Sequence, residues 1–173
     1  MLYSAVAIGA VMIAFVAVLA TRKSAVDQQT RSPLLGKVAP SLVGTDLGGT
    51  TFDLTSFRGK FVVVNFFASW CVPCQQEQPQ LVKFAHEPGS DRAVVGVLNQ
   101  DTRGPASRFM AENGGTWPAL LDGDGQHSLD WGVRGPPESY LINPDGIVLA
   151  KFIGQITAAR LDQLVAQAKG VAA

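Results

Sequence analysis

The chain has 173 residues, with 14 Lys and Arg against 14 Asp and Glu, and therefore no formal net charge. This length fits one domain plus an appendage, and a domain of this size needs no disulfide or metal to fold. The balanced charge offers no electrostatic attraction to nucleic acid, so we expect no nucleic-acid partner. Cysteine occurs only twice, three positions apart, which argues against a disulfide-stapled scaffold.

The first twenty residues are almost uninterruptedly apolar, with only Ser4 and Gly9 outside the apolar set. Twenty helical residues span about 30 Å, the thickness of the hydrocarbon core of a bilayer. We therefore expect residues 1–21 to form a transmembrane anchor. A cleaved signal peptide is the alternative, but the run exceeds the roughly 7–15 apolar residues of a signal, and no basic segment precedes it.

The charges beside this segment and the motifs in the rest of the sequence predict opposite sides of the membrane for the domain. Arg22, Lys23 and Arg31 follow it, and positive charges favour the cytoplasmic side. We nevertheless expect the domain on the extracytoplasmic side of a bacterial membrane, because of the motifs described below, and hypothesise that a basic start lies upstream of Met1. Residues 22–34 are polar and aperiodic, which predicts a linker.

The next elements alternate between strands and helices. Residues 61–68 (FVVVNFFA) are nearly all apolar, as expected for a central strand buried on both faces. The other elements expected before residue 115 are a small hairpin (42–43 with 51–54), a helical stretch (75–86), a buried strand (93–98) and a helix (105–113).

The last third of the chain predicts a short strand, a hairpin and two helices. These elements are a strand (119–121), a short helix (126–131), two hairpin strands (138–142 and 147–153) and a final helix capped by Thr157. Strands that alternate with helices and end in a hairpin indicate an α/β domain with a mixed central sheet. We place this domain at residues 35–173.

Cys71 and Cys74 follow the strongest strand directly, where a helix is expected to begin. Free N–H groups and the helix dipole stabilise a thiolate at such a position, which lowers a thiol pKa from about 8.5 to about 7 or less. The second thiol lies one turn further on, within reach of a mixed disulfide. Pro73 suits the first helical turn, where its missing N–H costs little. The pair predicts thiol–disulfide exchange.

Two plainer interpretations of the cysteines are weaker. A zinc site would need two more ligands, and His86 and His127 lack zinc-finger spacing. A purely structural disulfide would stabilise little, because it closes a very small loop. We therefore expect no metal, and no cofactor beyond a redox-active disulfide between Cys71 and Cys74.

Two longer motifs make a family resemblance specific. Residues 64–74 (VNFFASWCVPC) resemble the active-site strand and helix start of the thioredoxin superfamily, and Pro79 matches its helix-kinking proline. Residues 132–139 (GVRGPPES) resemble the Gly-Val-x-Gly-x-Pro-Glu-Thr segment of cytochrome c maturation thioredoxins, the CcmG/DsbE and ResA–TlpA type. Leu35-Gly36-Lys37 with Pro40, and the Asp122-Gly-Asp-Gly segment, match as well.

The resemblance implies a thioredoxin-like fold and a role for each matching residue. Cys71 is the implied nucleophile, Cys74 the resolving thiol, and Pro137 a cis proline that faces the disulfide and presents backbone to substrate. The implied substrate-binding or tuning residues are Trp70, Val72, Pro73, Glu77, Pro136, Pro137 and Glu138. The chain departs from the common pattern at Phe67, usually Trp, at Ser139, usually Thr, and at Pro136, which stiffens the loop.

Taken without the resemblance, several of these residues have plainer interpretations. Glu77 is typical of a solvated helix residue, and Glu138 of a strand start. Asn65, which interrupts the apolar strand, is best explained as a buried amide with satisfied hydrogen bonds. Asp122 and Asp124 lack the later acidic ligands of a calcium loop, so we interpret them as a turn.

The expected function is extracytoplasmic reduction of the apocytochrome c disulfide, or of other disulfide-bearing secreted proteins. By resemblance, electrons come from a membrane thiol transporter of the CcdA/DsbD type. The motif alone does not set the direction of exchange, which depends on relative reduction potentials. A general disulfide oxidase on the same fold is therefore one alternative. A redox-inactive thioredoxin-like binding module is the alternative from another class.

Overall fold

The central feature of the computed structural model is one six-stranded sheet. The structure describes residues 11–15, 29–87 and 91–171. The strand order is β1-β8-β7-β4-β5-β6. The strands are β1 (Gln29–Thr30), β4 (Phe61–Phe67), β5 (Arg92–Leu98), β6 (Ala119–Leu121), β7 (Glu138–Ile142) and β8 (Val148–Ile153). β4 pairs parallel with β5 and antiparallel with β7, so the predicted mixed α/β sheet is confirmed.

β4 lies in the middle of the sheet, and all seven of its residues are buried. Its side chains therefore pack into the core on both faces of the sheet, as the continuous FVVVNFF run predicts. The alternation of side chains along the strand assigns Phe61, Val63, Asn65 and Phe67 to one face. This places the amide of Asn65 on the face that the two long helices cover.

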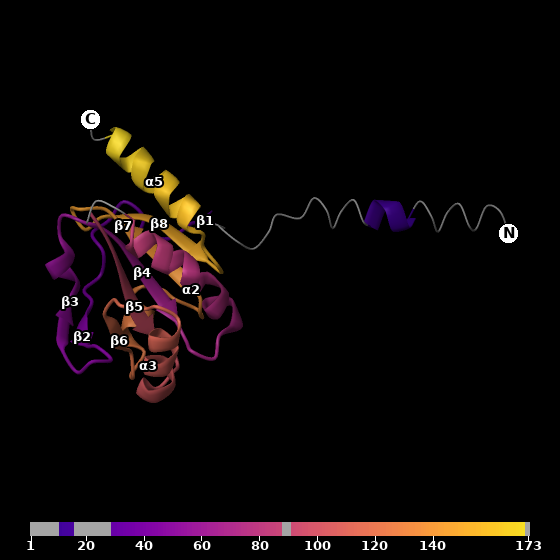
Figure 1. Ribbon diagram of the computed structural model, residues 1–173. Coiled ribbons are helices and arrows are strands. Elements are labelled where there is room, and N and C mark those ends of the chain that lie inside the picture. The colour runs from indigo at the N-terminus through magenta and orange to yellow at the C-terminus, as the bar shows by residue number, and fades with distance from the viewer. Residues whose placement is uncertain (1–10, 16–28, 88–90, 172–173) are drawn as a thin grey trace.

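The helices α2 (Val72–Ala85) and α5 (Ala158–Val171) pack together against one face of the sheet (Figure 1). The core there includes residues from both helices and from the two strands β4 and β7: Val63, Leu81, Phe84, Leu141, Leu161 and Val165. α3 (Arg103–Glu112) joins the same side near the end of β4, where Phe109 contacts Phe67 with ring centroids 5.8 Å apart. Burial of these apolar surfaces is the main force that holds the layer together.

The opposite face is covered by the small hairpin β2 (Val43–Thr45) and β3 (Thr51–Asp53), the 3-10 turn Leu54–Phe57 and the short helix α4 (Gln126–Asp130). Figure 1 shows the hairpin outside the central sheet. Leu42, predicted to begin the hairpin, instead precedes it and is buried in this core.

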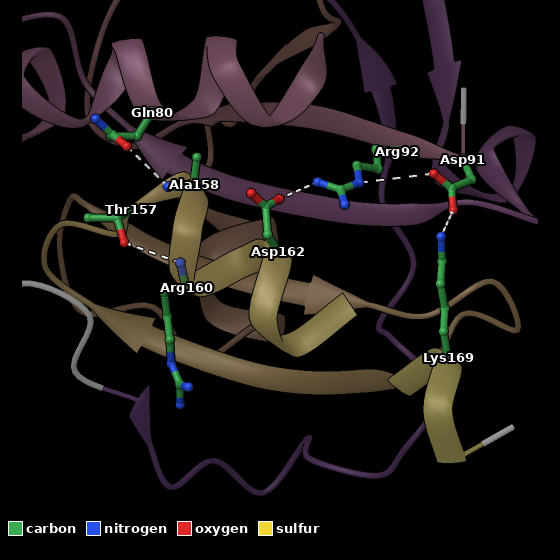
Figure 2. A network of polar contacts seen from close by, with 8 residues as sticks. All are labelled: Gln80, Asp91, Arg92, Thr157, Ala158, Arg160, Asp162 and Lys169. Carbon is green, nitrogen blue, oxygen red and sulfur yellow. Dashed lines mark hydrogen bonds and ion pairs between the residues drawn. The ribbon is translucent and has the colours of Figure 1, made fainter. Parts of the chain in front are cut away.

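Polar contacts fix the position of α5 (Figure 2). The N–H of Ala158 donates to Oε1 of Gln80 on α2 at 3.2 Å, and the N–H of Arg160 donates to Oγ1 of Thr157 at 3.3 Å, as predicted for a capping threonine. α5 also forms two ion pairs at the start of β5: Asp162 with Arg92, the first residue of the strand, and Lys169 with Asp91, the residue before it. Because these pairs are partly exposed, each stabilises the fold by no more than about 1 kcal/mol.

The N-terminal region differs from the expected linker at one point. Gln29 and Thr30, inside the segment predicted as linker, form β1 and pair with the edge of β8. An edge strand carries unpaired backbone groups, so even two residues with no strand pattern can pair with it. Residues 11–15 are helical, and most of the predicted anchor lies outside the described residues. Within the described parts of the chain, no helix is long and apolar enough to cross a membrane.

Candidate active site

The two cysteines lie at the start of α2, where they form a disulfide. Cys71 is the N-cap residue of the helix, and its sulfur accepts a hydrogen bond from the N–H of Cys74 at 3.2 Å. Only 4% of Cys71 and 1% of Cys74 are exposed. The first sulfur therefore occupies the position where free helical N–H groups can stabilise negative charge.

The helix begins earlier than its polar residues indicate. The polar stretch at 75–86 covers only the later part of α2, which starts at Val72, directly after Cys71. The helix start expected at the cysteines is confirmed, and Pro73 lies in the first turn, which needs no N–H from proline. Pro79 lies inside the helix.

The loop before the disulfide is held by the segment that follows β5. The N–H of Ser69 donates to Oδ2 of Asp101 at 2.6 Å, and Nε1 of Trp70 donates to the carbonyl of Gln100 at 3.1 Å. Gln100 has a positive φ of 53°, an uncommon conformation for a residue other than glycine. The indole of Trp70 is held in place, yet 58% of the residue remains exposed beside the disulfide, as does 58% of Val72.

Glu77 is buried behind the disulfide, one helical turn after Cys74, with 2% of the residue exposed. Its carboxylate accepts hydrogen bonds from Nδ2 of Asn65 at 2.7 Å and from the N–H of Ile156 at 3.0 Å. Burial raises the pKa of Glu77 from 4.5 to about 7, although both hydrogen bonds act to lower it. The alternative of a solvated helix residue is therefore wrong, and Asn65 is the satisfied buried amide that we predicted, since it also donates to Ser139 at 3.0 Å.

Glu138 is buried in a different environment. Its carboxylate forms an ion pair with Nζ of Lys151 at 2.7 Å, with 1% of the Glu138 and 8% of the Lys151 side chain exposed. The other oxygen accepts from the N–H of Arg134 at 2.9 Å. Burial lowers the pKa of Lys151, but hydrogen bonds with Glu138 and Tyr140 outweigh it and raise the pKa above its usual value. Glu138 is thus paired with a cation, whereas the two hydrogen-bond donors to Glu77 are both neutral groups.

Pro136 and Pro137 lie between these elements, in the loop that enters β7. Pro137 is buried, Pro136 is half-buried, and the peptide bond between them is cis. β7 runs antiparallel to β4, so its start lies at the carboxyl end of β4, where the chain continues to Cys71. The structure thus brings the GVRGPPES and WCVPC motifs to the same end of the sheet.

Asp122 and Asp124 belong to a turn, as predicted. The carboxylate of Asp122 accepts from the backbone N–H groups of His127 and Ser128 at 3.0 and 2.9 Å, and so holds the start of α4. Among the described residues, no group of three or more His, Cys, Asp or Glu side chains is arranged to hold a metal ion.

Most of the chain is similar to proteins of one known family. A family model described as Redoxin matches residues 34–166, which is most of the chain. The chain belongs to the Redoxin family. Within this family, thiol:disulfide interchange protein CycY of Rhizobium leguminosarum bv. viciae is 40% identical over 103 residues, which cover 59% of the chain but only 54% of that relative.

A second relative and a solved structure match a larger share of the chain. Thiol:disulfide interchange protein DsbE of Allochromatium vinosum is 34% identical over 146 residues, 80% of each chain. The thioredoxin domain of a thiol-disulfide oxidoreductase from Bacteroides vulgatus superposes with a TM-score of 0.69 at 26% identity, and the match covers 79% of this chain and 98% of that one. This redoxin is therefore a thiol:disulfide oxidoreductase with a thioredoxin-like fold.

Sequence reasoning missed three contributors to the site of this redoxin. Lys151 is the clearest, and a lysine within the otherwise apolar VLAKFI strand was its signal, since lysine is rarely buried unless paired. Asp101 follows a buried strand, but nothing local indicates that it binds Ser69. The Ile156 N–H reaches Glu77 across 79 positions of sequence, and no pattern in the chain marks such a contact.

Proposed function

We propose that this redoxin reduces the disulfide of apocytochrome c, so that haem can attach to the two free cysteines of a Cys-x-x-Cys-His site. The observation that carries the proposal is the Cys71–Cys74 pair at the start of α2, with the carboxylate of Glu77 buried behind it. The resemblance of residues 132–139 to cytochrome c maturation thioredoxins supports this choice of substrate over a general one.

In the proposed reaction, Cys71 is the nucleophile and Cys74 the resolving thiol. The Cys71 thiolate attacks one sulfur of the substrate disulfide, a mixed disulfide forms, and the other substrate sulfur leaves as a thiolate and takes up a proton. Cys74 then loses its proton and attacks the Cys71 sulfur, which releases the second substrate thiol and closes the Cys71–Cys74 disulfide. Two electrons and two protons pass to the substrate, and this chemistry uses no cofactor beyond the two thiols.

The surrounding residues have separate proposed roles. Trp70 and Val72, both largely exposed beside the disulfide, contact the substrate, and Pro73 shapes the first turn of the helix. Pro136 and Pro137 present the loop backbone to the substrate. Glu77 tunes the thiol chemistry through its charge. These assignments follow from exposure, position and resemblance together.

A dithiol on a membrane thiol transporter of the CcdA/DsbD type is the proposed electron donor, because the oxidised protein needs a reductant of lower or similar potential to return it to the dithiol form. The apolar segment at residues 1–21 is the proposed single-pass anchor in the bacterial cell membrane, with the redoxin domain on the extracytoplasmic side. Residues 22–28 would then connect the anchor to β1.

The roles of the two thiols can be tested by trapping. With a disulfide-closed Cys-x-x-Cys-His peptide, the reduced Cys74→Ser variant is expected to accumulate a mixed disulfide through Cys71, since no resolving thiol remains. The matched Cys71→Ser variant is expected to trap little, because Cys74 lies within the first turn of α2 and not at the N-cap position, where free N–H groups stabilise a thiolate. Mass spectrometry of the quenched mixture identifies the adduct. Equal trapping by both variants would reverse or remove the assigned roles.

The direction of exchange can be measured through the reduction potential of the protein. A dedicated reductant is expected to have a potential at or below about −250 mV, and a potential near about −120 mV would instead indicate an oxidase. Equilibration with glutathione or dithiothreitol buffers, followed by alkylation of free thiols, gives this value.

Localisation provides a separate test. We expect the protein to stay with membranes through high-salt and alkaline washing, because about twenty apolar residues anchor it in the hydrocarbon core. After mild reduction, a thiol reagent that does not cross the cell membrane is expected to label Cys71 in intact cells, provided that the reagent reaches the outer side of that membrane. The Cys71→Ser/Cys74→Ser variant measures the background labelling. Labelling only after lysis would put the domain in the cytosol.

A further inference from the structure

The first strand, β1, enters the sheet at the end where the disulfide lies. Gln29 of β1 pairs with Phe152 of β8, at the edge of the sheet (Figure 1). Phe152 also pairs with Ser139 of β7, and Ser139 pairs with Asn65 of β4. Since neighbouring strands lie about 4.8 Å apart, this row is about 14 Å wide. β8 leads toward the disulfide end and β1 is antiparallel to it, so the chain enters β1 from that end.

The connection between the proposed anchor and β1 is short. Only residues 22–28 separate residues 1–21 from Gln29. Seven residues span at most about 25 Å even when fully extended. With the anchor in the bilayer, Gln29 therefore lies within about 25 Å of the membrane surface. The surface of the domain beside β1 is thus the part that is held closest to the lipid.

A hollow of about 340 Å³ lies on this side of the domain, between β1, α4 and the end of β8. Arg31 lines it from the segment after β1, and Arg134 from the loop that enters β7. Leu129 of α4 and Ile153 of β8 line it as well, and they are 72% and 43% exposed. We call the surface formed by these four residues the tether-side surface. Its two large apolar side chains face solvent without cover from the described residues.

The tether-side surface has more free positive than negative charge. Its two arginines are exposed, and their guanidinium groups have no hydrogen-bond or ion-pair partner among the described residues. Lys151 also lines the hollow, but it is already paired with Glu138. Asp130 is the acidic residue exposed there. Free cations together with exposed apolar side chains favour a surface of anionic phospholipid, which offers phosphates and an apolar layer beneath them.

We propose that the tether-side surface rests on anionic phospholipid headgroups of the membrane that holds residues 1–21. The proposal depends on the anchor of the proposed function and specifies how the domain sits on its membrane. The two arginines bind lipid phosphates, while Leu129 and Ile153 enter the boundary between headgroups and acyl chains. Because Ile153 pairs with Glu138 at the start of β7, this surface lies at the disulfide end of the sheet. Docking therefore holds the disulfide close to dithiols and disulfides at the membrane surface.

The test uses the full-length chain in vesicles whose lipid headgroups carry a nitroxide quencher. In the Cys71→Ser/Cys74→Ser background, a fluorophore is attached to one new cysteine, at either Gln126→Cys or Ser56→Cys. Both positions are exposed and uncharged. Gln126 lies in α4, one turn before the tether-side residue Leu129. Ser56 lies in the 3-10 turn at the other end of the sheet, where the N–H of Gly59 donates to the carbonyl of Pro144 at 3.0 Å.

Addition of phosphatidylglycerol to phosphatidylcholine vesicles is expected to increase quenching at the Gln126→Cys label and to leave the Ser56→Cys label little quenched. Arg31→Gln/Arg134→Gln is expected to lower the ratio of docked to undocked domains about thirtyfold, or about fivefold for each arginine. High salt is expected to act in the same direction, because it screens exposed charges. The matched control, Arg58→Gln/Arg108→Gln, removes two exposed arginines elsewhere and is expected to leave docking unchanged.

Three results would overturn the docked surface. They are equal quenching at the two labels, quenching at Gln126→Cys that does not respond to phosphatidylglycerol, and an equal loss of docking in the two arginine variants. The last result would mean that only the total charge of the chain matters. A chain that fails to float with the vesicles after a high-salt wash would overturn the anchor itself, and with it the part of the proposed function on which docking depends.

Discussion

Replacing Lys151 with methionine is expected to lower the free energy of unfolding by about 3–5 kcal/mol at neutral pH, because it leaves a buried carboxylate without its cation. The pair is almost fully buried, with Nζ of Lys151 2.7 Å from Oε2 of Glu138. The ammonium also binds the carbonyl of Gly132, so the loop that enters β7 loses a second contact. Urea unfolding, followed by tryptophan fluorescence, measures the change.

The double variant Lys151→Met/Glu138→Gln is the control for this interpretation. It removes both charges together and keeps a side chain of similar volume at each position, so it is expected to recover most of the lost stability. An equal loss in the single and double variants would mean that the effect comes from packing of the lysine stem rather than from an unpaired charge.

Replacing Glu77 with glutamine is expected to remove a pH dependence of stability. Burial raises the pKa of Glu77 from 4.5 to about 7. The folded protein therefore keeps a proton that the unfolded chain releases, and the wild type loses stability as the pH rises from 4.5 toward 7. Over the whole window the loss is about 3 kcal/mol.

The measurement compares unfolding free energies of wild type and Glu77→Gln at about pH 4 and about pH 8. The difference between them is expected to change by about 3 kcal/mol in favour of the variant at the higher pH. Glu112→Gln, the same substitution at an exposed residue of α3, is the control and is expected to follow the wild type. Parallel curves for Glu77→Gln and wild type would contradict the raised pKa.

The Glu77→Gln variant also tests which of the two glutamates raises the pKa of the Cys71 thiol. Glu77 lies one turn after Cys74 and has no cation among its hydrogen-bond partners, so its charge opposes a thiolate at Cys71. In Glu77→Gln, the curve of Cys71 alkylation rate against pH is expected to move to lower pH. The variant Lys151→Met/Glu138→Gln removes an ion pair that has no net charge, so it is expected to leave the alkylation curve unchanged. Superimposable curves for all three proteins would return Glu77 to a structural role.

Local sequence patterns determined the chemistry and the class of fold. The FVVVNFFA run predicted a central strand buried on both faces, because an interior strand has no solvent side to mark with polar residues. Cys71 and Cys74 follow that strand at the helical spacing that redox exchange needs. Turn and cap residues such as Thr157 predicted several element boundaries, since these residues act through contacts only a few positions away.

Tertiary structure alone decided the electrostatics of the site. In the sequence, Glu77 has the pattern of a solvated helix residue. In the fold, it is a hydrogen-bond acceptor for Asn65 of strand β4 and for the N–H of Ile156 in the segment after β8. Glu138 and Lys151 meet only because β7 and β8 pair with one another. Burial and partner choice depend on which distant segments pack together, and one sequence records the residue types but not the energies of those long-range contacts. For that reason the sequence indicated which residues could act, and the fold determined that Glu77 has only neutral partners while Glu138 is paired with Lys151.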